Sequence, residues 1–243
     1  KPAYLLLSQN EDVSVMLNSE DHIRIKSFAP GQDLMQAYNK ANDLDDIFIG
    51  GLKIAFSDKY GFLTSSPADL GTAMRASVVL HLPALRENNL INKLSQTVSK
   101  LGLSLHAMYE DGAGDIYVLT NRVTLGITEK SAIYNTNAVC EQIVNQERKA
   151  RETLCESVDF QDKIYRALGV LKLARRLSTK EFLSGISLVR LGVAMGYFDY
   201  SYSLLGNMIY NLFDATLVDS SKSDLSKEMC ESLRAQIVRE KLG

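Results

Sequence analysis

The sequence contains few cysteines, prolines and histidines and lacks tryptophan. Its 243 residues include no tryptophan, three cysteines, four prolines and three histidines. Three widely spaced cysteines without a Cys-x-x-Cys pair exclude a disulfide framework and give no zinc-ligand pattern. No apolar run approaches the roughly 18 residues of a membrane span, and the N-terminus shows no signal-peptide pattern. We therefore expect a cytoplasmic protein without a membrane partner.

The sequence also lacks an excess of charge of either sign. Lysine and arginine total 27, aspartate and glutamate total 29, and the net charge is -2. A balance so close to neutral gives no broad positive surface, so we expect no nucleic-acid partner. Any anionic ligand has to be held by a local cluster of arginines. The 46% hydrophobic and 23% charged residues are typical of a globular protein with one large or two smaller domains.

The first 155 residues alternate short strands with helices. Alternation and helical spacing predict strands at 3–7, 13–17, 23–28, 52–56, 60–64, 76–82, 103–109 and 116–120, and helices at 32–48, 84–101 and 129–154. Short turns between neighbouring strands favour an antiparallel sheet flanked by helices, an α+β fold. The predicted core comprises Leu5, Val15, Ile23, Ile25, Leu34, Tyr38, Val78, Leu80, Leu105, Val118, Leu168, Leu171, Ile186 and Leu191.

The pattern changes after Cys155, where the sequence shows no strand. An apolar stripe from Ile164 to Ala174 predicts one helix, and Ser178 with Glu181 forms a capping-box pattern that opens a second. Two more helices fit 201–216 and 226–240. The sequence therefore predicts two domains, an α+β domain over 1–155 and a small all-helical domain of about four helices over 156–243.

Three short segments carry side chains that suit chemistry. Residues 18–24 read Asn-Ser-Glu-Asp-His-Ile-Arg and put two carboxylates beside an arginine at a turn between strands. A carboxylate accepts two parallel hydrogen bonds from a guanidinium, so this turn suits an arginine-like substrate. The plainer alternative is a polar turn with a local ion pair.

The second and third segments are loops. In residues 65–75 a proline and a glycine fix an irregular loop that ends at Arg75, before the apolar strand 78–82. A charged residue there is either paired or available to an anion such as phosphate. Residues 106–115 form an acidic, glycine-containing loop between strands, which either closes over a ligand or keeps a hairpin solvated.

Taken in order, the three segments resemble the catalytic domain of the phosphagen (guanidino) kinases. The resemblance rests on Asn-x-Glu-Asp-His-x-Arg at 18–24, on Pro-x-x-Leu-Gly-Thr-x-x-Arg at 67–75 and on the carboxylate-bearing loop. Residues 165–171 and 189–192 are similar to the helical C-terminal domain of the bacterial protein arginine kinases. The resemblance implies an ATP:protein-arginine phosphotransferase that acts in protein quality control.

The resemblance also implies roles for individual residues. Glu20 would hold and polarise the substrate guanidinium as the base, next to Ser66, and Asp111 would be a second, loop-borne carboxylate. The nucleotide-binding positions would be Arg24, Arg75 and His106. The implied cofactor is ATP, with Mg²⁺ carried by the nucleotide and no metal site of the protein's own.

Several positions depart from the family pattern. Serine stands at 19 and 66 where the family has glutamate and cysteine, His106 replaces an arginine, and the loop carboxylate is the shorter Asp111. Near the C-terminus only the second half of a phosphoarginine-sensing motif is present, at Arg234 and Ala235. The alternative is therefore a catalytically degenerate relative that binds arginine or phosphoarginine proteins or pairs with an intact kinase.

The implied partners are arginine-bearing protein substrates, a Clp-type protease system and an activator protein. Residues 197–213 are rich in aromatic and apolar side chains, which predicts either ordinary burial or a homodimer contact.

Overall fold

A computed structural model describes residues 2–243 and contains two compact units. Both are discontinuous in sequence: unit 1 runs to Val79 and includes Lys93–His106 and Val118–Ile143, whereas unit 2 comprises Leu80–Asn92, Ala107–Tyr117 and Val144–Gly243. The boundary at residue 155 stays a prediction. Within 2–243 the helices are all too short or too polar to cross a bilayer.

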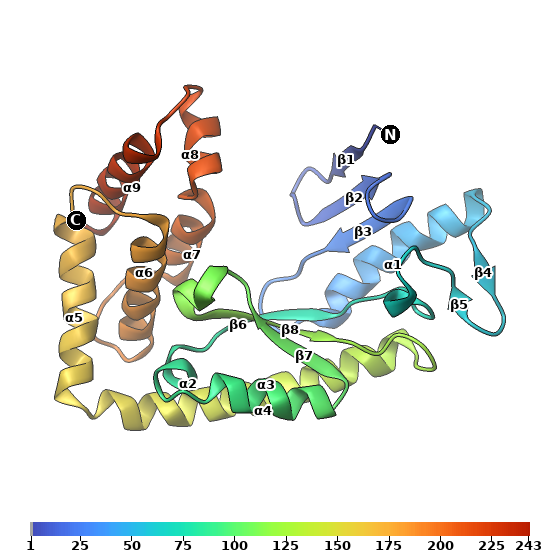
Figure 1. The fold of residues 1–243 in the computed structure, drawn as a ribbon, viewed down its shortest axis with the longest axis horizontal. Coiled ribbons are helices and arrows are strands. Elements are labelled where there is room, and N and C mark those ends of the chain that lie inside the picture. The colour runs from blue at the N-terminus through green and yellow to red at the C-terminus, as the bar shows by residue number, and fades with distance from the viewer. Residues whose placement is uncertain (1) are drawn as a thin grey trace. The chain divides into compact units, whose positions relative to one another are not determined.

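Unit 1 begins with the predicted hairpin and third strand. β1 (Tyr4–Leu7), β2 (Val13–Leu17) and β3 (Ile23–Ser27) form an antiparallel sheet in that order (Figure 1). Helix α1 (Leu34–Gly51) packs on β3 and begins where Asp33 accepts a hydrogen bond from the Gln36 N–H, 2.9 Å away. The prediction of Leu5 as a core residue is wrong. It is 57% exposed, because β1 is an edge strand and all four of its residues face solvent.

A short hairpin follows in place of two longer strands. β4 (Phe56–Ser57) and β5 (Gly61–Phe62) have two residues each, and the rings of Phe56 and Phe62 meet edge to face. The strands are shorter than predicted. The Leu63 N–H still donates to the Ala55 carbonyl at 2.9 Å, whereas the Phe62 N–H donates to Gly71, also at 2.9 Å. A 3₁₀ turn, η1 (Pro67–Asp69), follows.

The remaining strands, β6 (Ser77–His81), β7 (Leu103–Ala107) and β8 (Ile116–Asn121), form a second three-stranded sheet in the order β6-β8-β7. Helix α3 (Ile91–Lys100) lies beside β7, where the Ser95 hydroxyl donates to the carbonyl of Leu105 at 3.1 Å. The long helix predicted at 129–154 is confirmed as α4 (Glu129–Cys155). The α+β class is confirmed, with several small sheets where one was expected.

The single helix predicted over 84–101 is wrong, because two helices occupy this segment. α2 (Pro83–Glu87) ends before Asn89, whose φ of 58° lies in the left-handed region, and α3 begins at Ile91. The Leu90 N–H donates to Leu85, so the chain turns here rather than continuing the helix. Asparagine tolerates this backbone conformation better than most residues.

Residues 157–243, all within the described part, are helical as predicted. They form α5 (Val158–Leu173), α6 (Thr179–Ala194), α7 (Tyr202–Asn211), α8 (Asp214–Ser221) and α9 (Lys227–Leu242). The predicted helix 201–216 is split at Phe213, whose backbone is extended. The capping box of Ser178 and Glu181 is confirmed.

The helices of unit 2 enclose an apolar core. Leu205, Met208 and Ile209 are buried, so much of the aromatic and apolar segment 197–213 serves this core. Of the predicted core residues, those that are buried are Val15, Val78, Leu80, Leu105, Leu171, Ile186 and Leu191. Those that are only half-buried are Ile23, Ile25, Leu34, Tyr38, Val118 and Leu168.

Candidate functional site

The turn between β2 and β3 carries Glu20, and Arg24 follows as the second residue of β3. Asn18 enters the turn with a φ of 56°, and its N–H donates to the His22 carbonyl at 2.9 Å. Arg24 Nη1 lies 3.6 Å from Glu20 Oε2, and the two side chains are 49% and 59% exposed. An ion pair so exposed contributes about 0–1 kcal/mol, so either partner can exchange it for a ligand at little cost.

The loop that carries Ser66 is fastened to this turn. The Ser65 N–H donates to Asp21 Oδ1 at 2.7 Å, and the Ser65 hydroxyl donates to the Glu20 carbonyl at 3.0 Å. Ser66 follows directly and precedes η1, where its side chain makes no capping hydrogen bond. Unit 1 thus brings the predicted residues Glu20, Arg24 and Ser66 into one region, with Asp21 and Ser65 as the link.

Arg75 is paired with its own loop. Its Nε and Nη2 lie 2.7 and 2.6 Å from Asp69 Oδ1, its Nη2 donates to the Ala68 carbonyl at 3.0 Å, and its Nη1 donates to the Asn121 carbonyl at 2.7 Å. The buried Asn121 side chain in turn accepts the Ala76 N–H at 2.7 Å. Of the two alternatives for Arg75, the structure shows the paired arginine. All three guanidinium nitrogens of Arg75 therefore have partners in the structure.

The other two predicted residues lie apart from this cluster in the chain. His106 is an exposed residue near the end of β7 in unit 1. Asp111 belongs to unit 2, on η2 (Glu110–Asp115), with a φ of 54°. Its Oδ2 lies 2.9 Å from Lys180 Nζ, and this hydrogen-bonded ammonium lowers the pKa of the Asp111 carboxyl. Asp111 is therefore held as a carboxylate.

A polar network lies behind η2. Ser187 of α6 donates to the Asp115 carboxylate and lies 2.8 Å from His81 Nε2. His81, the last residue of the apolar strand β6, is a hydrogen-bonded structural histidine. Burial, together with the guanidinium groups of Arg190 and Arg151, lowers the pKa of His81 well below its usual range. The folded protein therefore keeps this imidazole neutral near pH 7.

This histidine makes stability depend on pH. Below about pH 6.5, His81 binds a proton in the unfolded chain but stays neutral in the folded chain. Because the unfolded state then binds more protons, we expect the free energy of unfolding to fall as pH decreases. The contribution of one such group has a slope of at most about 1.4 kcal/mol per pH unit. Urea unfolding between pH 7.5 and 5.5 measures it. His81→Gln should flatten the slope, whereas the same change at the exposed His22 should not; equal slopes in wild type and His81→Gln would contradict the assignment.

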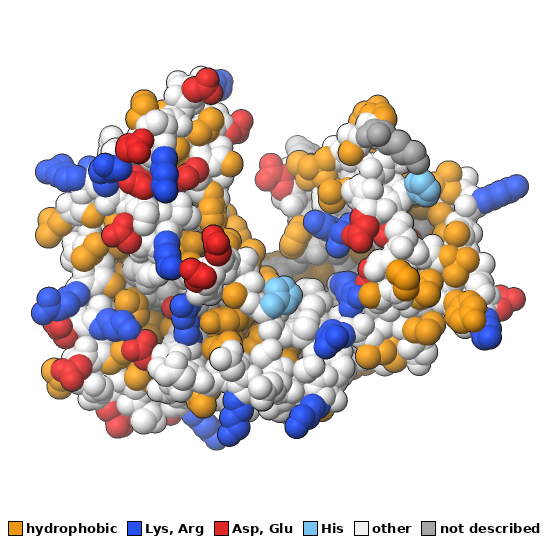
Figure 2. Space-filling model, viewed as in Figure 1, with side chains coloured by type: hydrophobic (Ala, Val, Ile, Leu, Met, Phe, Trp, Pro, Cys, Tyr) orange, Lys and Arg blue, Asp and Glu red, His pale blue; other side chains and the backbone are white. Residues whose placement is uncertain are grey.

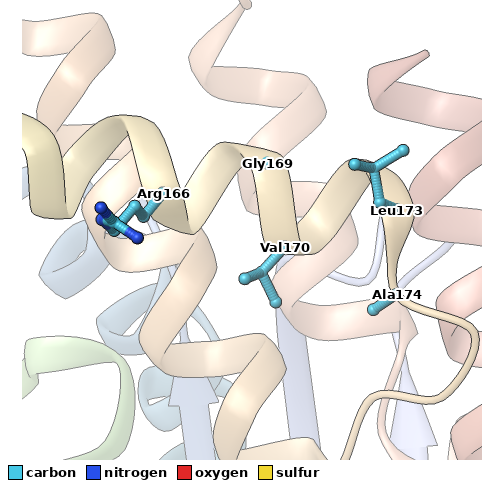
Figure 3. A pocket seen from close by; sticks show the side chains of 5 residues that line it. All are labelled: Arg166, Gly169, Val170, Leu173 and Ala174. Carbon is cyan, nitrogen blue, oxygen red and sulfur yellow. The ribbon is translucent and has the colours of Figure 1, made fainter.

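Among the hollows on the described surface, one of about 580 Å³ lies along α5. Figure 3 shows its lining of Arg166, Gly169, Val170, Leu173 and Ala174, all from the second half of this helix and the residue after it. The hollow is open and mostly apolar, and hydrophobic side chains are spread over the visible surface of both units (Figure 2). The predicted site residues do not line it.

Sequence reasoning missed the partners of the predicted residues. Asp69 and Asn121 hold Arg75, whereas Lys180, Arg86 and Ser187 hold the loop of Asp111. Asp69 stands six residues before Arg75, and a carboxylate so near an arginine was a usable signal. The other partners are distant in sequence, and only the fold brings them together.

Comparisons with known proteins match two consecutive segments of the chain. Residues 2–150 match the profile of the ATP:guanido phosphotransferase C-terminal catalytic domain, and residues 157–243 match the protein-arginine kinase McsB C-terminal domain. The protein-arginine kinase of Clostridium acetobutylicum is 39% identical over 243 residues, covering 98% of this chain and 72% of the relative. The protein-arginine kinase of Halothermothrix orenii is 37% identical over 245 residues, covering 98% and 70%.

Solved structures are similar over part of the chain. The duplicated taurocyamine kinase from Schistosoma mansoni with bound transition state analog components gives a TM-score of 0.56 at 25% identity, over 74% of this chain and 25% of that one. Its substrate-free form gives a TM-score of 0.52 at 30% identity, over 58% and 19%.

Proposed function

Since this chain belongs to the ATP:guanido phosphotransferase family, we propose that it transfers the γ-phosphoryl group of ATP to arginine side chains of proteins. The observation that carries the proposal is the fastening of the Glu20 turn to the Ser66 loop through Ser65. It ties the backbone of the turn that carries the exposed Glu20 carboxylate to the residue before Ser66, and a carboxylate is the acceptor that a guanidinium needs. Similarity over nearly the whole chain to proteins named protein-arginine kinase favours this enzyme over a relative that only binds.

Glu20 supplies the acceptor for the substrate. An ionised carboxylate takes two parallel hydrogen bonds from a guanidinium and withdraws a proton as the nitrogen attacks phosphorus. Arg24 occupies Glu20 in the free protein, through the 3.6 Å exposed pair. A substrate arginine replaces Arg24 at this carboxylate, which releases the Arg24 guanidinium for the negative charge of the nucleotide.

The nucleotide is ATP, as the family implies, and Arg24 and Arg75 are the side chains we assign to its phosphates. Guanidinium groups suit this role because they are always charged and bind phosphate oxygens in a bidentate manner. Mg²⁺ carried by ATP neutralises phosphate charge, and phosphoryl transfer depends chiefly on such neutralisation and on positioning. His106 is the third nucleotide-binding candidate, although an imidazole lacks the fork of parallel donors that a guanidinium offers to phosphate.

Asp111 is the second carboxylate of the proposal. Its carboxylate attracts a guanidinium, and a substrate arginine would have to share or replace the exposed Lys180 ammonium that now pairs with it. We further propose proteins with accessible arginine side chains as the substrates. The Clp-type protease, the activator protein, the homodimer and the cytoplasmic location remain predictions from the sequence.

An assay of phosphate transfer tests the proposal. The full chain is incubated with Mg-ATP and an arginine-rich protein, and acid-labile phosphate on the protein is measured. We expect a signal that Glu20→Gln lowers by at least about 10²-fold, because the base is lost together with the negative charge that holds the guanidinium. Glu141→Gln, the same change at an exposed site on α4, should leave it unchanged.

Two results would contradict the proposal. Wild-type chain that transfers no more phosphate than a Mg-ATP blank would refute the activity. Transfer that survives Glu20→Gln at the wild-type rate would remove Glu20 from the reaction and leave the activity to other residues.

A further inference from the structure

The loop that carries Asp111 contains several residues with left-handed backbone conformations. Within η2, Asp111, Gly112, Gly114 and Asp115 have φ values of 54°, 70°, 76° and 54°. Aspartate enters the left-handed region more readily than most residues but still at a cost, so four such conformations in five residues persist only where surrounding contacts support them. Something outside the loop must therefore supply its shape.

Arg86, just after β6 on α2, supplies the first set of contacts. Its guanidinium donates to the carbonyls of Asp111, at 3.0 Å, and Gly112, and its Nη1 lies 3.2 Å from Asp115 Oδ1. The fit is close, because a Cβ on Gly112 would lie 2.8 Å from Arg86 Nη1. One side chain thus binds both the backbone of the loop and the carboxylate at its end.

Helix α6 supplies the second set. Ser187, which is 1% exposed, donates its hydroxyl proton to the other oxygen of Asp115. Because that proton is used, the Ser187 oxygen accepts from His81, and the neutral imidazole carries its proton on Nε2. Both carboxylate oxygens of Asp115 therefore have a partner: Arg86 pairs with Oδ1, and Ser187 donates to Oδ2.

Apolar packing and an ion pair complete the attachment to α6. Ala113 and Ile116 are buried in the core that contains Leu183 and Ile186 of this helix. One turn before Leu183, Lys180 forms its ion pair with the carboxylate of Asp111. The helix therefore contacts the loop at three levels, through Lys180, Leu183 and Ser187.

We propose that α6 anchors the η2 loop and that Ser187 is a positioning residue, which acts on Asp111 through Asp115 and the loop backbone. In this proposal a helix of the C-terminal segment determines the position of the Asp111 carboxylate, which belongs to the segment that matches the catalytic domain. The role of Asp111 in the reaction rests on the proposed function, whereas the anchoring itself does not.

Hydrogen–deuterium exchange of the full chain, without ligands, tests the anchor. Removing the hydroxyl in Ser187→Ala leaves the Asp115 carboxylate and the His81 ring without a shared partner. We expect the amides of residues 109–117 to exchange about tenfold faster, while those of α9 exchange as in wild type. Ser184→Ala, the same change at an exposed position of α6, is the matched control and should not alter exchange.

Asp115→Asn gives a second test that needs no buried cavity, because asparagine keeps the shape and loses the charge that Arg86 and Ser187 bind. It should increase exchange in the same segment. If neither Ser187→Ala nor Asp115→Asn accelerates exchange of residues 109–117 beyond the Ser184→Ala control, the anchor is refuted. A Ser187→Ala chain that fails to fold leaves the decision to Asp115→Asn.

Kinetics then separates positioning from general stability. A displaced Asp111 should lower kcat for the arginine substrate by about tenfold or more and leave KM for ATP near its wild-type value. A decrease in kcat that is accompanied by an equal-fold increase in KM for ATP would refute the positioning role. Wild-type chain without activity would refute the proposed function, yet the exchange experiment would still decide whether α6 anchors the loop.

Discussion

Replacing Arg234 by methionine should lower the free energy of unfolding by about 3–5 kcal/mol. Arg234 is completely buried in the helical core of unit 2. Its Nε and Nη1 donate to the carbonyls of Leu212 and Leu177, both at 2.7 Å, and its Nη2 binds the carboxylate of Asp214. Methionine fills much of the space but leaves two buried carbonyls unpaired, and their lost hydrogen bonds cause the destabilisation.

Chemical denaturation followed by circular dichroism measures this loss. Arg166→Met is the matched control, because Arg166 forms an exposed pair with Asp162 on α5, and such pairs contribute about 0–1 kcal/mol. If both variants lose the same small amount, Arg234 is not the structural centre we describe. The burial also bears on the partial sensing motif: with all its nitrogens bound to the protein, Arg234 offers nothing to a phosphoarginine.

Replacing Arg75 by alanine should lower kcat for phosphate transfer by about 10³-fold or more, if its guanidinium stabilises the charge of the transferring phosphoryl group. The change also removes the bonds to Asp69, Ala68 and Asn121, so stability should fall too. Transfer assays and thermal unfolding are measured side by side. Arg122→Ala, at an exposed arginine beyond β8, controls for loss of positive charge.

Asp69→Asn separates the two roles of Arg75. It removes the carboxylate that now neutralises the guanidinium but keeps a side chain of the same shape. If Arg75 binds phosphate, this variant should bind ATP at least as tightly as wild type, because a competing anion is gone. An equal loss of ATP affinity in Asp69→Asn and Arg75→Ala would show that Arg75 only shapes its loop.

The sequence was a good guide wherever the determinants are local. Strand alternation in residues 13–27 and the Ser178–Glu181 pattern predicted β2, β3 and the start of α6, because each depends on neighbours within a few residues. The sequence was a poorer guide to α2, α3 and β1. Asn89 divides one helical pattern into α2 and α3, and the apolar run of β1 has no polar alternation that would mark a buried face.

The same distinction applies to the candidate site. Glu20, Arg24 and Ser66 were predicted from the family resemblance, and the structure ties the Glu20 turn to the Ser66 loop through Ser65, the residue before Ser66. The counter-ion Lys180 lies 69 residues from Asp111, and Ser187 lies 72 from Asp115. Periodicity and composition carry no information on pairs so distant, whose contact is a product of tertiary packing.

The discontinuous make-up of unit 2 has a consequence for how this protein can be divided. Residues 80–92 and 107–117, inside the segment that matches the catalytic domain, fold with the helices that match the C-terminal domain. A gene cut between the two matched segments would give a first fragment with Ala113 and Ile116 stripped of Leu183 and Ile186. Such fragments should aggregate when produced separately. We therefore expect the two matched segments to fold only as parts of the same chain.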